Sequence, residues 1–134
     1  MVSLTEALYR AESAKMQALL AEERRLRAEL EQLEARRRAT IVVTDECLLG
    51  YREIGADLMW QSWIGRSKAH LHADLARILG RKGQVIIRLR RTYGKYLAAT
   101  QLFKDETESY ARQREARRLS LLEDLGQLQQ SHAK

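Results

Sequence analysis

The stretch MWQSWIGRSKAHLH, residues 59–72, lies between two long periodic segments and predicts where the chain turns back on itself. Gly65 suits the left-handed conformation that ends many helices, and Ser67 suits the N-cap of a helix that follows. We therefore expect a chain reversal near residues 64–67. Two roles stay open for Trp60 and Trp63: they pack around this reversal, or they form a tip that contacts a partner.

Apolar residues recur at alternating three- and four-residue steps on both sides of this stretch, which is the spacing of a coiled-coil seam. Before it, the seam comprises Met16, Leu19, Leu26, Leu30 and Leu33, with Glu23 filling one slot, and resumes through Cys47, Tyr51, Ile54 and Leu58. After it, the seam comprises Leu71, Leu75, Ile78, Val85, Leu89, Tyr96, Ala99, Phe103 and Tyr110, interrupted by Lys82, Thr92 and Glu106. It then slips in phase at Arg114 and Arg118 and continues through Leu121, Leu125 and Leu128.

Composition agrees with long helices, because the chain of 134 residues has no proline, 31% charged residues and only 6% aromatic residues. The sequence predicts an all-α fold: one domain, residues 1–134, forming a long antiparallel two-helix coiled-coil hairpin. Its arms are expected at about 3–64 and 67–131, with the turn near 64–67. The β-branched run TIVVT, residues 40–44, lowers helix propensity and allows a kink or break near 38–45.

The cysteine count, the length of the aliphatic runs and the histidine spacing limit which cellular compartment and which chemistry we expect. A lone cysteine, Cys47, fits a reducing compartment, and the longest aliphatic runs, 41–43 and 85–87, are far too short to cross a membrane. We expect a cytoplasmic protein without membrane insertion. His70 and His72 are two residues apart, so on a helix they point away from each other and cannot share a metal. The residues show no catalytic arrangement, so we expect no enzyme, no catalytic or metal-binding residues and no cofactor.

Positive charge gathers in the second half of the chain, where residues 65–104 hold ten basic and one acidic side chain. This basic surface includes Arg77, Arg81, Arg88, Arg90, Arg91 and Lys95. Three interpretations stay open: a solvated helix face, a surface that docks on an acidic protein, or a nucleic-acid contact.

The segment ILGRKGQVIIRL, residues 78–89, resembles the Gly-x-x-Gly loop of KH domains, with Gly80, Arg81, Lys82 and Gly83 as the loop. A KH fold needs a three-stranded sheet, however, and the flanking residues are typical of helix. In a helix, Gly80, Ile87 and Gly94 share the stripe opposite the seam. That outer face is a candidate second contact surface.

The chain as a whole resembles the FliJ/YscO group of type III export proteins. The resemblance rests on CLLGYREIGADLMWQSWIGRSKAHLHADLARILGRKGQVIIRL, residues 47–89, and on ESYARQREARR, residues 108–118. Members of that group are small, basic, cytoplasmic helical hairpins associated with the flagellar or injectisome ATPase. The resemblance does not distinguish a flagellar from an injectisome system.

The resemblance implies a non-enzymatic central stalk or adapter, cytoplasmic and peripheral to a membrane-embedded secretion apparatus. Its partners would be a hexameric export ATPase, an export gate protein and, as a further class, export chaperones. With equal arms, the residues near both termini would gather and contact the ATPase: Arg10, Lys15, Arg112, Arg114, Arg117 and Arg118. The gate or another partner would contact Trp60, Trp63, Arg77, Gly80, Arg81, Ile87, Arg88, Arg90 and Arg91. The alternatives are a generic coiled-coil scaffold or tether and a basic nucleic-acid-binding protein.

Overall fold

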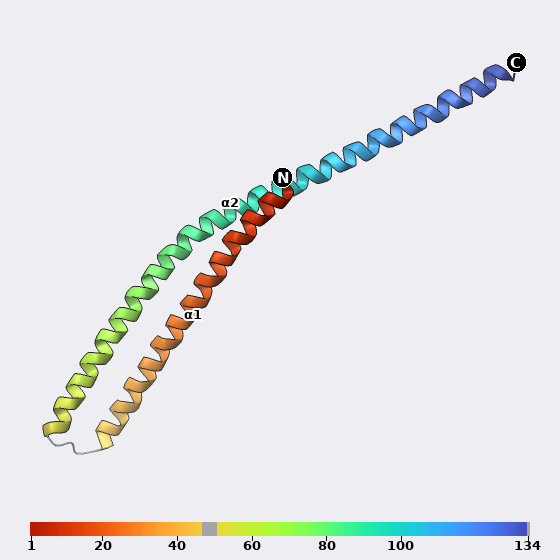
Figure 1. Cartoon of the computed structure of the whole chain (residues 1–134). Coiled ribbons are helices and arrows are strands. Elements are labelled where there is room, and N and C mark those ends of the chain that lie inside the picture. Colours follow the sequence, from red (N-terminus) through yellow and green to blue (C-terminus); the bar gives the residue numbers. More distant parts are fainter. Residues whose placement is uncertain (47–50, 134) are drawn as a thin grey trace. The chain divides into compact units, whose positions relative to one another are not determined.

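The computed structural model describes the backbone of residues 1–46 and 51–133, and the side chains of residues 1–41 and 55–133. The chain forms two helices, α1 (Val2–Glu46) and α2 (Tyr51–His132), which lie antiparallel (Figure 1). The expected all-α helical hairpin is confirmed. Contacts divide the chain into two compact units, described separately below. The hairpin unit is Arg10–Arg90, and the terminal unit is Met1–Tyr9 with Arg91–Lys134.

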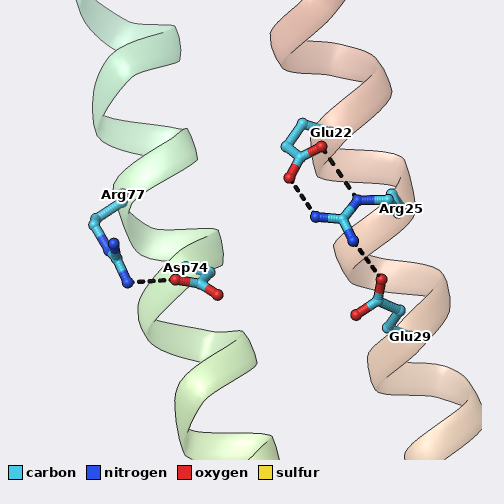
Figure 2. Close-up of polar contacts among 5 residues, drawn as sticks. All are labelled: Glu22, Arg25, Glu29, Asp74 and Arg77. Atoms are coloured by element: carbon cyan, nitrogen blue, oxygen red, sulfur yellow. Dashed lines mark hydrogen bonds and ion pairs between the residues drawn. The ribbon is translucent and has the colours of Figure 1, made fainter.

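Charged side chains on the exposed faces support both helices. Figure 2 shows Arg25 between Glu22 and Glu29 on α1, and Arg77 paired with Asp74 on α2. Arg25 Nη1 lies 2.7 Å from Glu29 Oε1, and Arg25 Nε donates to Glu22 Oε2 at 3.2 Å. Pairs three and four residues apart favour helix over the unfolded chain, each by a small amount.

The apolar seam of the hairpin unit follows the predicted spacing. Its most buried apolar residues are Met16, Leu26 and Leu33 on α1 and Ile64 and Val85 on α2. The predicted seam residues Leu19, Leu30, Leu71, Leu75, Ile78 and Leu89 are half-buried. Leu58 was assigned to the seam and is 65% exposed, so that assignment is wrong. Cys47, Tyr51 and Ile54 lie outside the described side chains.

The predicted turn near 64–67 is wrong, because α2 runs through these residues without interruption. Ile64 is buried in the seam, and Gly65 does not have a positive φ. A glycine inside a helix costs only about 1 kcal/mol relative to alanine, and burial of an isoleucine contributes more. The arms are therefore α1, which ends at Glu46, and α2, which begins at Tyr51, rather than 3–64 and 67–131.

The β-branched run does not break the first helix. α1 continues through residues 38–45 and ends at Glu46, directly after the run. Thr40 donates its hydroxyl to the carbonyl of Arg36 at 2.9 Å, as a threonine does within regular helix. The low helix propensity of this run thus coincides with the end of the helix rather than with a joint inside it.

In the terminal unit, the first turns of α1 pack on α2. The Tyr9 ring lies 5.2 Å from the Tyr93 ring and stacks at 5.8 Å and 9° on the Tyr96 ring. An apolar groove lies between Met1–Ser3 and the α2 residues Ala99, Leu102 and Phe103, and extends to Ser109.

Beyond this groove, α2 is uncovered: every described residue from 110 to 133 is exposed. Phe103 and Tyr110, assigned to a buried seam, are each 62% exposed, so that part of the prediction is wrong. Over the residues that the structure describes, neither helix combines the length and the apolar character needed to cross a membrane.

Candidate functional site

A charged layer interrupts the apolar seam of the hairpin unit. Glu23 occupies a seam slot of α1 and is only 8% exposed. Its Oε2 accepts a hydrogen bond from Lys82 Nζ of α2 at 2.9 Å, and its Oε1 accepts from Arg27 at 2.8 Å and 3.0 Å. Glu23 and Lys82, which each interrupt one of the predicted seams, are therefore each other's partners. A polar pair inside a seam favours one register of the helices, because sliding either helix separates the charges.

A second pair joins the helices nearer the end of α1, where Lys68 pairs with Glu34. The hydrogen bond from Lys82 and then that from Arg27 hold the pKa of Glu23 below its ordinary value, although partial burial opposes them. The hydrogen bond from Lys68 likewise lowers the pKa of Glu34, with the Arg37 and Arg38 charges adding to the effect. Both carboxylates are thus stabilised in their charged form in the folded hairpin.

Acid should weaken the hairpin through these two carboxylates. Their folded pKa values lie below the ordinary value of about 4.3, so the pairs stabilise the fold above that pH, and the contribution is lost as pH falls through the folded values. We expect the thermal midpoint, followed by circular dichroism, to fall between about pH 5 and pH 3.

The double variant Glu23→Gln, Glu34→Gln should show a lower midpoint at neutral pH and a flatter pH profile. Glu31→Gln, which removes an exposed carboxylate from the same helix, serves as the control and should keep the wild-type slope. A double variant with the full wild-type slope would show that other carboxylates govern the acid response.

A basic groove lies on the hairpin unit between the two helices. Its apolar residues are Leu19, Ile78 and Val85, and its basic residues are Lys15, Arg81 and Arg88, with one acidic residue, Glu22, also lining it. Glu12 approaches this groove from α1, where Lys15 Nζ lies 3.0 Å from Glu12 Oε1 and Arg88 Nε lies 3.6 Å from Glu12 Oε2. Apolar residues beside cationic groups suit a partner that offers an apolar side chain next to a carboxylate.

The groove places Lys15 beside a residue that was assigned to a different partner. Lys15 and Arg88 were expected at opposite ends of the molecule, one facing the ATPase and the other the export gate, yet they line the same groove. The expectation rested on equal arms, whereas α1 has 45 residues and α2 has 82. Arg10 also belongs to the hairpin unit, while the basic residues near the end of α2 belong to the terminal unit, namely Arg112, Arg114, Arg117 and Arg118. The six proposed ATPase contacts are therefore divided between the two units.

The tryptophans lie inside α2 rather than at a helix end. Their rings stack at 5.1 Å and 21°. Trp63 is 43% exposed and borders a shallow depression with Leu33 and His70. Trp60 is half-buried, and its Nε1 has no hydrogen-bond partner among the described residues. Packing around a reversal at 64–67 is therefore wrong, and Trp63 is a partly exposed ring beside α1.

The outer face of α2 in the hairpin unit carries the remaining proposed contacts. Gly80, Gly83, Ile87 and Arg90 are exposed there, and a Cβ atom added at either glycine would meet no atom within 4 Å. Arg77 is exposed and paired with Asp74, and Arg91 begins the terminal unit. The Gly-x-x-Gly segment is helical and the described residues contain no strand, so the KH-like interpretation is wrong.

The terminal unit holds an exposed apolar surface. The sequence interpretation assigned Leu121, Leu125 and Leu128 to the continuing seam between the arms, and that assignment is wrong because all three are more than half exposed. Five leucines after residue 118 are at least half exposed: Leu119, Leu121, Leu122, Leu125 and Leu128. They follow the four arginines on the same helix, so apolar and basic side chains share one uncovered segment. The sequence indicated this surface through the length of the second periodic segment. That segment is longer than α1, so α1 cannot cover all of it.

No protein-family model, curated protein or solved structure matches the chain. The functional assignment therefore depends on the surfaces described above and on the resemblance carried by residues 47–89 and 108–118.

Proposed function

We propose that the chain is a non-enzymatic stalk or adapter of a type III protein export ATPase complex, which docks in the ATPase ring and contacts the export gate. The family resemblance of residues 47–89 and 108–118 motivates the proposal. The structural observation that supports it most directly is the uncovered basic segment of α2 in the terminal unit, with Arg112, Arg114, Arg117 and Arg118 all exposed.

An uncovered helix suits contact with a ring, because subunits can approach it from every side. The four arginines point in several directions around α2, and within this segment the structure records only the pair between Arg118 and Glu115, at 3.5 Å. Four guanidinium groups with few acidic neighbours attract an acidic surface and speed its association, and salt weakens that attraction.

The hairpin unit supplies the second contact in this proposal. Trp63, Ile87 and the basic groove of Arg81 and Arg88 present aromatic, apolar and cationic groups on one helix. Aromatic residues and arginine are enriched where protein interfaces gain most of their binding energy. In this role the protein is cytoplasmic and peripheral to the secretion apparatus, and its gate-facing surface lies on α2 of the hairpin unit.

A passive coiled-coil tether is the second candidate function. The observation that favours it is the seam itself, since a heptad pattern with one charged layer needs no specialised partner. The two functions differ in what the purified protein does to an ATPase: an adapter of this kind alters ATP hydrolysis by the hexamer, and a passive tether does not.

The test is binding of the purified chain to the cognate export ATPase at low and moderate salt. Reversing the four arginines, with Arg112→Glu, Arg114→Glu, Arg117→Glu and Arg118→Glu, should weaken binding by at least about a hundredfold at low salt. The reason is that four attractive groups become repulsive on a helix that remains solvent-exposed. Circular dichroism should show unchanged helical content.

The matched control reverses exposed basic residues of the hairpin unit, Arg77→Glu, Arg81→Glu and Arg90→Glu. These changes should spare ATPase binding and reduce capture of the export gate protein. Undiminished ATPase binding by the arginine-reversal variant would remove the terminal unit as the contact. Wild-type binding of nucleic acid with the same salt dependence would favour the nucleic-acid alternative.

A further inference from the structure

From Tyr110 onward, every described residue of α2 is exposed, and this part of the helix continues a regular seam. We name residues 107–132 the tail segment. Successive steps of four and three residues place one stripe along it, comprising Thr107, Ala111, Arg114, Arg118, Leu121, Leu125, Leu128 and His132. The three leucines of this stripe are 57–63% exposed. Such spacing over about four heptads is that of a helix with a partner helix.

The exposure of these leucines leaves apolar surface in contact with water, which is unfavourable in free energy. Removing a leucine side chain from water is favourable, and a partner helix would cover several of them. The tail segment also lacks the dense ladder of ion pairs that stabilises solitary helices: among its described residues the structure records one, between Arg118 and Glu115. A covering helix is thus the missing element of the terminal unit.

We infer that the covering helix is the tail segment of a second copy of this chain, running antiparallel. The charge pattern selects this occupant and this direction. A parallel, in-register pair would set Arg114 against Arg114 and Arg118 against Arg118, placing like charges in two successive layers. An antiparallel pair sets each arginine against a leucine, since the stripe is basic in its first half and apolar in its second.

In one antiparallel register, no residue of the stripe faces a residue of like charge. It is the register in which Arg118 lies opposite Leu121 and Arg114 lies opposite Leu125 of the other copy. Ala111 then lies opposite Leu128, and Thr107 opposite His132. The aliphatic stems of the arginines cover the facing leucines while their guanidinium groups reach water at the edge of the seam.

Charges beside the stripe support the same register. Arg117 and Asp124 are one heptad apart and flank the same side of the stripe. Same-side flanks meet in an antiparallel pair, so Arg117 of each copy lies beside Asp124 of the other, giving two reciprocal ion pairs. Sliding by one heptad in one direction sets Asp124 against Asp124, and sliding in the other sets Arg114 against Arg118 in one layer. The self-complementary register is therefore the one without like charges in contact.

The extent of the overlap agrees with the terminal unit. The overlap begins at Thr107, near the end of the groove that Met1–Ser3 form with α2, which extends to Ser109. The pairing covers Arg114, Arg117 and Arg118, so a second copy and an ATPase ring compete for the same segment. Self-association nevertheless needs no ATPase, and the two proposals succeed or fail independently.

The test is sedimentation equilibrium of the full chain over a concentration series at low and moderate salt, with circular dichroism on every variant. We expect a reversible monomer–dimer equilibrium that weakens with salt. Leu125→Arg should remove the dimer, because it sets a second guanidinium against Arg114 of the other copy in both equivalent layers, while helical content at low concentration is retained. A wild-type chain that stays monomeric at every concentration would overturn the inference.

Charge exchange tests the register directly. Arg117→Glu and Asp124→Arg should each raise the dimer dissociation constant about tenfold, because each change turns both reciprocal attractions into repulsions. The double variant Arg117→Glu, Asp124→Arg should recover an affinity close to wild type. Arg112→Glu makes the same charge change on the face away from the stripe and should leave the dimer intact, although it belongs to the proposed ATPase contact. Failure of the double variant to recover would reject this register.

Direction is tested by one distance. In a Cys47→Ser background, spin labels on Ser131→Cys should lie about 35 Å apart in the antiparallel register, at about 1.5 Å per residue. A parallel pair would bring the same labels within roughly 20 Å, given helix axes about 10 Å apart. The shorter distance would overturn the proposed arrangement.

Discussion

Leu26→Asp is expected to unfold the hairpin unit at temperatures where the wild-type protein is fully helical. Leu26 is 2% exposed, the least of the buried apolar residues. A carboxylate there would be buried without a partner, which costs about 3 kcal/mol or more. A two-helix structure has few such buried residues, so it has little stability in reserve. Thermal and urea unfolding followed by circular dichroism would measure the loss.

The control for this change is Ile87→Asp on the outer face of the same unit. Ile87 is 61% exposed, so a carboxylate at this position stays in water and the free energy of unfolding should change by no more than about 0.5 kcal/mol. Equal destabilisation by the two variants would show that the seam does not face the partner helix as described.

The seam could be predicted from sequence because it depends on local spacing. Alternating steps of three and four residues place Met16, Leu26 and Leu33 on one stripe whatever their partner is, and all three are buried. The turn could not be predicted in the same way. Gly65 and Ser67 carry genuine local signals for a helix end, but the seam position of Ile64 outweighs them, and that comparison needs the partner helix.

The charges of facing residues on the two helices indicate where the chain turns, whereas the local helix-end signals at Gly65 and Ser67 gave the wrong position. A reversal at 64–67 would bring Glu23 opposite about residue 108, where a second glutamate stands. In the structure, Lys82 Nζ instead lies 2.9 Å from Glu23 Oε2. Matching Glu23 with Lys82, the basic residue among the interruptions of the second seam, would thus have chosen the shorter first arm.

Whether the grouping of the candidate site residues could be predicted depended on whether it required the position of the turn. Arg81 and Arg88 lie together because they are close in sequence on one helix, and that part of the candidate surface could be predicted. The gathering of Lys15 with the arginines near the end of α2 was expected from equal arms, and these residues belong to different units of the structure. The uncovered tail segment could not be recognised for the same reason, since a longer first arm was expected to cover it.

Replacing Gly80 and Gly83 with alanine should stabilise the hairpin unit and weaken its contact with a partner. Both glycines lie inside α2 without positive φ, and an added Cβ atom meets nothing within 4 Å. Each replacement should therefore gain up to about 1 kcal/mol from helix propensity, or roughly 2 kcal/mol for the double variant, measured by urea unfolding.

The matched control is Gly65→Ala, a glycine of the same helix with equally open surroundings. It should gain about 1 kcal/mol and leave partner binding unchanged, because it lies outside the proposed outer-face contact. If Gly80 and Gly83 exist to let a partner's backbone approach beside Ile87, the double variant should lose affinity for the export gate protein while it gains stability. A double variant that is less stable than wild type would instead show that α2 needs these glycines for its own conformation. One that is more stable with unchanged affinity would move the gate contact away from this face and toward the basic groove of Arg81 and Arg88.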